Sequence, residues 1–230
     1  MSFLNDAWGL VTRLGEAQIL LPAMFAALLW LVLLARTPRT AWWWLAGTAV
    51  VALITTATKV AFFGYGVGYA PLDYTGISGH AMFAAAVLPV LAGLMTGGVT
   101  PRGRLAAIGV GYLLAALIAN SRLRVGAHSS SEALAGILLG SLASALALGA
   151  QRLPDMRPPL WLGVGLLLWI LSLPLSAPPS VTHDWVVRLS LAVSDRAEPY
   201  SRRAMHRDYR REMKRHTATQ LSAQVPAHWR

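Results

Sequence analysis

Residues 17–35 read AQILLPAMFAALLWLVLLA and contain no charged residue. A helix needs about 20 mostly apolar residues to cross a hydrocarbon layer of about 30 Å, so this run is long enough to span a membrane. Five more apolar segments follow, and none shows the alternating pattern of a membrane β-strand. The sequence therefore predicts an all-α, polytopic membrane helical bundle of about six transmembrane helices, the other five lying at about residues 41–63, 80–97, 104–120, 132–150 and 159–176.

The composition of the whole chain agrees with a membrane protein. Of its 230 residues, 55% are hydrophobic and only 13% are charged, and the mean hydropathy is +0.50. A soluble domain carries about 25% charged residues, so an ordinary water-soluble fold is excluded. The chain has no cysteine, which excludes disulfides and thiolate metal sites.

We expect three parts along the chain. Residues 1–16 mix apolar and polar side chains, which favours a short amphipathic segment at the membrane interface. Residues 17–176 form the membrane domain. Residues 177–230 form a basic tail, partly disordered or helical, that is either attracted to anionic lipid headgroups or merely solvated. Within the membrane domain we interpret recurring small residues as sites of close helix packing, namely Gly109, Gly111, Gly136, Gly140, Gly163 and Gly165.

The connections between the apolar segments alternate in chemistry. Residues 36–40, 98–104 and 151–158 carry six arginines, whereas 64–79 and 121–131 are Gly-rich, with Ser, His, Asp and a few basic residues. The positive-inside rule places the arginine-bearing side in the cytoplasm and the other side, with both termini, in the periplasm. The basic tail opposes this assignment, but long tails weigh less in the rule than short loops. Arginine outnumbers lysine 18 to 2, and Ala, Leu and Gly are abundant, which indicates a GC-rich bacterial genome. We expect a multi-pass protein of the bacterial inner (cytoplasmic) membrane.

Ionisable and small polar residues gather at one end of the predicted bundle. Such residues at the ends of membrane segments are costly and often functional. The hairpin topology implied by the span count brings four helix ends to one membrane level. The residues concerned are Lys59, then Ser78, Gly79 and His80, then Ser121, Arg122 and Arg124, and finally His128 and Glu132.

These residue types suit an anionic substrate. Lys59 and Arg122 can hold an anion by charge, and the planar guanidinium can bind two phosphate oxygens. Ser78 and Gly79 stand where the third apolar segment begins, and a helix amino terminus offers free N–H groups to an anion. The pattern therefore indicates phosphate binding.

The two histidines add a means of covalent chemistry. One of His80 and His128 can attack while the other protonates the departing group. Glu132 follows His128 by four residues, one helical turn away on the same face, where a carboxylate can orient the imidazole.

Two stretches carry a family resemblance. GISGH, residues 76–80, and SRLRVGAHSSSE, residues 121–132, with Lys59 before them, resemble the type 2 phosphatidic acid phosphatase (PAP2) superfamily over roughly residues 50–150. That family has a Lys-containing first motif, a Pro-Ser-Gly-His second motif, and a third motif of Ser-Arg, five residues, His, three residues and Asp. The resemblance implies that His128 is a nucleophile forming a phosphohistidine, that His80 is the general acid and base, and that the phosphate is held by Lys59, Ser78, Gly79, Ser121 and Arg122.

The chain departs from the family pattern in three places. The first motif has an arginine seven residues after its lysine, but Gly66 stands there, and Arg124 is the candidate replacement. Ile77 stands where proline is usual, and Glu132 replaces aspartate, which lengthens the orienting arm by one methylene.

The expected function is a membrane lipid phosphatase that needs no metal, because Lys59, Arg122 and backbone N–H groups meet the developing charge. Its expected partners are membrane lipids and a phosphorylated lipid substrate (phosphatidic acid, phosphatidylglycerophosphate, undecaprenyl diphosphate or a lipid A phosphate), and not nucleic acid. One alternative is a catalytically weakened lipid-phosphate-binding or scaffold protein. A less favoured one is a bis-histidine haem protein.

Residues outside these motifs are expected to have no part in the chemistry. We interpret Asp73 as loop structure, or as a ligand for a headgroup. The tail histidines lack the spacing of metal ligands, and we expect no catalytic role for His183, His206, His216 or His228.

Overall fold

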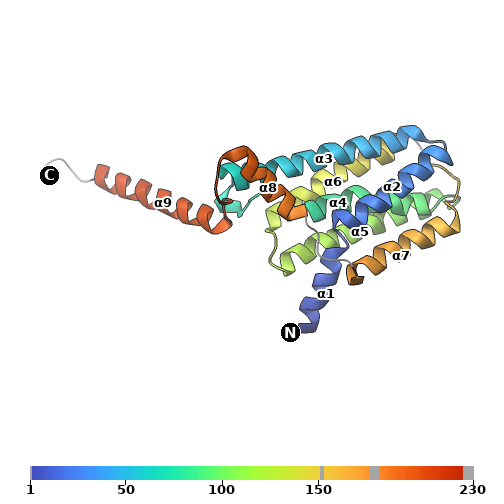
Figure 1. The fold of residues 1–230 in the computed structure, drawn as a ribbon, viewed down its shortest axis with the longest axis horizontal. Helices are drawn as coiled ribbons and strands as arrows, with labels where there is room; N and C mark the ends of the chain where they lie inside the picture. Colours follow the sequence, from blue (N-terminus) through green and yellow to red (C-terminus); the bar gives the residue numbers. More distant parts are fainter. Residues whose placement is uncertain (1, 151–152, 177–181, 225–230) are drawn as a thin grey trace.

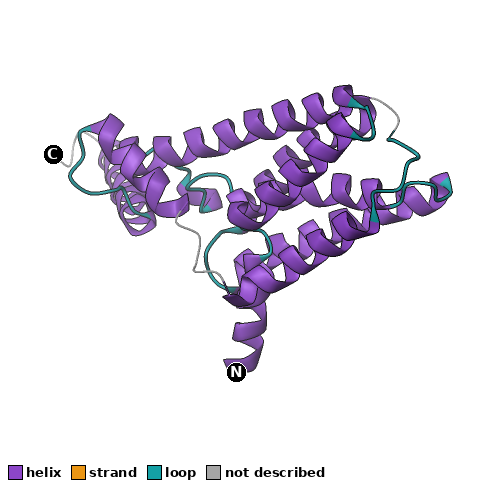
Figure 2. Cartoon of the chain, turned by 45° about the vertical axis from the view of Figure 1, so that its right-hand side comes forward, coloured by secondary structure: helices purple, strands orange, loops and turns teal. Residues whose placement is uncertain are grey.

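The computed structural model is a bundle of roughly parallel and antiparallel helices that continues into a projecting C-terminal helix (Figure 1). It describes residues 2–150, 153–176 and 182–224, and within these ranges it contains helices and loops but no β-strand (Figure 2). The predicted all-α class is therefore confirmed. The helices are α1 (Ser2–Arg13), α2 (Ala17–Leu33), α3 (Pro38–Tyr65), the short 3₁₀ helix η1 (Ala70–Leu72), α4 (Gly79–Met95), α5 (Pro101–Arg124), α6 (Ser130–Ala150), α7 (Leu160–Ser176), α8 (Thr182–Ser194) and α9 (Arg202–Gln224).

The apolar helices account for the predicted membrane segments. In the described part of the chain, α3, α5 and α6 are long and apolar enough to cross a membrane, and α1 with α2, bent by 42°, makes a fourth span if the pair counts as one. The helices α4 and α7 are apolar but shorter. Large side chains such as Leu53, Leu113 and Leu138 are exposed on the outside of the bundle, as expected where lipid is the solvent. The chain is a membrane protein in which helices α2 to α7 match the six predicted segments.

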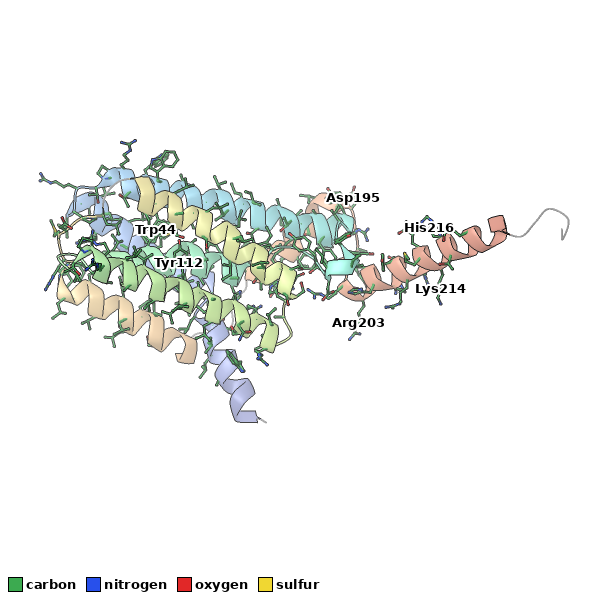
Figure 3. The ribbon with its side chains drawn as sticks, turned by 180° about the vertical axis from the view of Figure 1, so that it is seen from behind. Trp44, Tyr112, Asp195, Arg203, Lys214 and His216 are labelled. Carbon is green, nitrogen blue, oxygen red and sulfur yellow. The ribbon has the colours of Figure 1, made fainter. Side chains whose placement is uncertain are left out.

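The helix α4 lies at the centre of the bundle. It packs against α2, α3, α5 and α6, and its residues from Ala84 to Val87 are completely buried. The indole of Trp44 in α3, labelled in Figure 3, donates a hydrogen bond of 2.9 Å to the carbonyl of Ala86. Neighbouring helices therefore enclose the middle of α4, whereas Gly79 and His80 at its amino terminus are only half-buried.

Small residues allow this close packing. A Cβ atom on Gly136 of α6 would lie 2.6 Å from the carbonyl oxygen of Ser78, and one on Gly111 of α5 would lie 2.6 Å from Cα of Pro89. The interpretation of Gly111, Gly136 and Gly140 as packing positions is confirmed. It is wrong for Gly109 and Gly165, since no described residue lies within 4 Å of a Cβ built there, and Gly163 makes only an ordinary contact at 3.7 Å with Met95.

The C-terminal segment returns to the end of the bundle where the α3–α4 and α5–α6 loops lie (Figure 1). Helix α8 packs against α3, and the backbone N–H of Tyr200 donates to the carbonyl of Phe63 over 2.8 Å. Helix α9 begins beside η1 and then projects away from the bundle. The tail is thus helical over 182–194 and 202–224, while 177–181 and 225–230 fall outside the described residues.

Candidate active site

A cavity of about 230 Å³ lies at the end of the bundle that carries the predicted polar residues. Five of those residues line it together, although they come from three helices and one loop. They are Lys59 of α3, Gly79 and His80 of α4, Arg122 of α5, and His128 of the α5–α6 loop. The hairpin topology therefore brings the two family-like motifs and the lysine to one place.

His128 is paired with Glu132. Its Nδ1 lies 2.6 Å from Oε2 of the glutamate, which is fully buried and also accepts hydrogen bonds from the backbone N–H groups of Ser129 (3.1 Å) and Thr75 (2.7 Å). A carboxylate only accepts hydrogen bonds, so we assign the imidazole proton to Nδ1. This tautomer leaves the lone pair of Nε2 available for attack on a substrate.

A tight loop ties His128 to the end of α5. Gly126 has a φ of +68°, a left-handed conformation that suits glycine, and it lets the chain fold back on the helix. The backbone N–H groups of Ala127 and His128 donate to the carbonyl of Arg122 over 3.0 and 3.2 Å. Burial lowers the pKa of His128 from its ordinary value, against the hydrogen bond with Glu132 that raises it, so the imidazole is neutral at neutral pH.

Two cationic side chains, from α3 and α5, line the cavity. Arg122 donates from Nη1 to Oγ1 of Thr12 in α1 over 3.0 Å, while its Nε is buried and has no partner among the described residues. Lys59 lies beneath the loop before α4, where Gly76 has a φ of +126° and a Cβ would lie 3.1 Å from Cγ of the lysine. Both cations can therefore reach an anion in the cavity.

The amino terminus of α4 supplies neutral donors. Ser78 is the N-cap residue, and its backbone N–H donates to the carbonyl of Glu132 over 3.1 Å, which fixes α4 against α6. The first N–H groups of a helix have no partner within the helix, so those at Gly79 and His80 point toward the cavity end. The hydroxyls of Ser78 and Thr55 are buried and have no partner within the described ranges. Thr55 lines the cavity, so its hydroxyl can bind a ligand.

Three predicted phosphate ligands do not line the cavity, namely Ser78, Ser121 and Arg124. The hydroxyl of Ser121 is buried and donates over 2.6 Å to the carbonyl of Ile118, within its own helix. Arg124 is exposed at the end of α5 and does not line the cavity. These positions favour a packing role for Ser121 and a solvated one for Arg124.

The structure adds residues that sequence reasoning missed. His183 and Val186 of α8 line the cavity, a position that the sequence did not predict for any residue of the tail. Asp73 pairs with two residues of α9, His206 and Arg202, and Arg202 also reaches Glu132. The tail carries no motif, so nothing in its sequence places it beside the cavity.

Comparison with known proteins agrees with the geometry of the site. A Klebsiella pneumoniae protein described as an uncharacterized 22.5 kDa protein in the cps region is 38% identical over 205 residues, which cover 87% of this chain and 98% of that protein. No solved structure matches the chain significantly. The family model of the PAP2 superfamily matches residues 59–153, a range that runs from Lys59 through both histidines and Glu132. The chain belongs to the PAP2 superfamily.

Proposed function

We propose that the protein is a membrane lipid phosphatase that hydrolyses a lipid phosphomonoester or diphosphate through a phosphohistidine at His128. Membership of the PAP2 superfamily supports phosphatase-type activity in general. The observation that carries the specific proposal is the shared cavity, in which His128, His80, Lys59 and Arg122 line one chamber.

In the first step Nε2 of His128 attacks the phosphorus atom. A P–N bond forms, the P–O bond to the lipid breaks, and His80 gives its proton to the departing oxygen. Glu132 stabilises the positive charge that the phosphorylated imidazole acquires, through its hydrogen bond with Nδ1. Lys59, Arg122 and the N–H groups at the start of α4 stabilise the negative charge on the phosphoryl oxygens.

In the second step water replaces the imidazole. His80, now neutral, takes a proton from the attacking water as the new P–O bond forms and the P–N bond breaks. Inorganic phosphate leaves, and both histidines return to their starting states. The developing charge is met by cations and backbone N–H groups, so we propose a reaction that needs no metal.

The lining of the cavity favours a lipid over a water-soluble phosphate ester. Beside the charged groups, the cavity is walled by apolar side chains from four helices, among them Leu21 of α2, Ala52 of α3, Phe83 of α4 and Val186 of α8. A cavity that is charged on one side and apolar on the other suits a headgroup phosphate with the first carbons of its lipid tail.

A second candidate function is binding of lipid phosphate without turnover. Its specific support is Gly66, which stands where the family resemblance places an arginine and leaves Lys59 and Arg122 as the cationic side chains in the cavity lining. A site with one cation fewer can retain affinity for phosphate while stabilising the transition state less well.

Phosphate release from a panel of lipid phosphates by the purified protein in chelator, compared with His128→Ala, tests the proposal. We expect release by the wild type and a fall of about a thousandfold or more in the variant, because the nucleophile is gone. His216→Ala, which changes an exposed histidine of α9 (Figure 3), is the matched control. Activity that persists in His128→Ala removes this nucleophile, and a wild type that binds lipid phosphate without releasing any supports the binding function.

We further propose that the site faces the periplasm of a bacterial inner membrane. The support is the loop asymmetry, since the arginine-bearing loops lie at the end opposite the cavity. The C-terminal segment packs at the cavity end, so a reporter fused after Arg230 reports the side of the site. We expect alkaline phosphatase fused there to be active, because this enzyme requires export. Fluorescence from a reporter that folds only in the cytoplasm would show instead that the site faces the cytoplasm.

A further inference from the structure

The C-terminal segment packs against three glycines at every second position where α3 ends, namely Gly64, Gly66 and Gly68. A Cβ on Gly64 would lie 3.1 Å from the carbonyl of Ser190, and one on Gly68 would lie 2.7 Å from Sδ of Met205. Between them, Gly66 has a φ of +74° and the ring of Tyr200 packs over it, 3.5 Å from a Cβ built there. Tyr200 therefore covers Gly66, the position at which the family pattern has an arginine, and Arg202 follows Tyr200 by two residues.

The side chain of Arg202 contacts Glu132, the residue that orients His128. Its Nη2 lies 2.8 Å from both carboxylate oxygens of Glu132 and 3.2 Å from Oγ1 of Thr75. Its Nη1 donates to Asp73, whose other oxygen lies 2.6 Å from Nε2 of His206. Both ends of the guanidinium fork are thus held by carboxylates.

These contacts distinguish Arg202 from a phosphate ligand. Its side chain does not line the cavity, and its Nη groups are engaged with Asp73, Thr75 and Glu132. We propose that Arg202 is a positioning residue of the phosphatase reaction, which clamps Glu132 from the outer side and through it sets the orientation and basicity of His128. The proposal rests on the proposed function, in that it names a further residue of the same site.

The charges around His128 determine in which direction the loss of Arg202 shifts its pKa. Glu132 of α6 favours its protonation, whereas Lys59 of α3 and Arg122 of α5 oppose it. The other ionisable groups on the cavity wall are His80 of α4 and His183 of α8, which oppose protonation when they are charged. Arg202 adds a cation on the far side of the glutamate, and its loss leaves the full carboxylate charge to stabilise the imidazolium.

The experiment compares Arg202→Met and Arg202→Lys with Arg203→Met, which changes the neighbouring exposed arginine (Figure 3). For Arg202→Met we expect kcat to fall about ten- to a hundredfold, as when partners that orient a reacting group are lost, with KM nearly unchanged. The acid limb of the kcat/KM profile should move to higher pH by about one unit, because His128 is protonated more easily. Arg202→Lys keeps the charge and should restore the acid limb, and Arg203→Met should match the wild type.

A measurement of the pKa of His128 that needs no catalytic turnover tests the role of Arg202 independently of the phosphatase activity. Diethyl pyrocarbonate modifies neutral imidazole, so its rate at His128 against pH, followed by peptide mass spectrometry, reports the pKa of that residue in each variant. A pKa that rises in Arg202→Met supports the clamp even if the wild type releases no phosphate from any lipid. An unmoved pKa in a folded Arg202→Met, or a raised KM with normal kcat, overturns it.

Discussion

At the end of the bundle away from the cavity, Arg104 donates to the carbonyls of Leu153 and Pro154 over 3.1 Å and pairs with Asp155, while Arg157 donates to the carbonyl of Gly97 over 3.0 Å. At the cavity end, Arg122 donates to a single hydroxyl, that of Thr12. The Nε of Arg122, like that of Arg104, is buried without a partner among the described residues, but Arg122 lines the cavity. One kind of side chain thus closes loops at one end and is left available for a ligand at the other.

The difference lies in what the arginine donors meet. Backbone carbonyls at a loop complete the hydrogen bonding of the fold, and both Nη groups of Arg104 are engaged there. A buried donor without a partner costs free energy in the empty protein, and a phosphate oxygen removes that cost on binding. We therefore expect substitutions at the cavity end to reduce activity and substitutions at the other end to reduce stability.

The largest effect in this comparison is expected from Arg122→Ala. The substitution removes a cation that faces the substrate phosphoryl group, so kcat/KM should fall by about a hundred- to a thousandfold while the thermal midpoint changes little. Phosphate release from the best lipid of the panel, together with a thermal melt in detergent, measures both quantities. Arg122→Lys should recover part of the activity, since it keeps the charge but loses the planar fork.

Arg102→Ala is the control on the same helix. Arg102 is exposed in the first turn of α5, at the opposite end from Arg122, and its removal changes neither the cavity nor a loop contact. A fall of less than tenfold for Arg122→Ala, or a similar fall for both variants, would contradict the role assigned to Arg122 at the cavity.

The bundle and the core of the site could be predicted because local rules fix them. Apolar runs locate the helices to within a few residues, and hairpin topology then forces Lys59, His80, Arg122 and His128 to one end. The four-residue spacing predicted the pairing of His128 with Glu132, and the pair appears in the structure at 2.6 Å, although His128 lies in the loop before α6 and only Glu132 lies in the helix. These relations depend on separations of a few residues or on the order of the spans.

The contribution of the tail could not be predicted, because it depends on contacts between residues far apart in the chain. Arg202 and Glu132 are 70 residues apart, and no spacing rule connects them. The glycines from Gly64 to Gly68 indicate that another segment can pack closely there, but they do not identify that segment as the tail. Likewise Arg124 resembled a replacement ligand in sequence, whereas the direction of α5 at its last turn leaves it exposed.

The smallest effect on chemistry, and a clear effect on stability, is expected from Arg104→Ala. The guanidinium makes three hydrogen bonds of 3.1 Å to residues 153–155, so its loss leaves the two carbonyls without these donors and frees the start of the chain that leads into α7. The bond to the exposed Asp155 contributes little, and the two bonds to carbonyls contribute about 1 kcal/mol each. Their loss corresponds to a fall of about 4–8 °C in the thermal midpoint for a protein of this size. Because the cavity lies at the other end of the bundle, kcat/KM below the melting range should stay within about threefold of the wild type. Arg102→Ala should leave both quantities near the wild-type values, and a loss of activity in folded Arg104→Ala comparable with that of Arg122→Ala would mean that the two ends are coupled through α5.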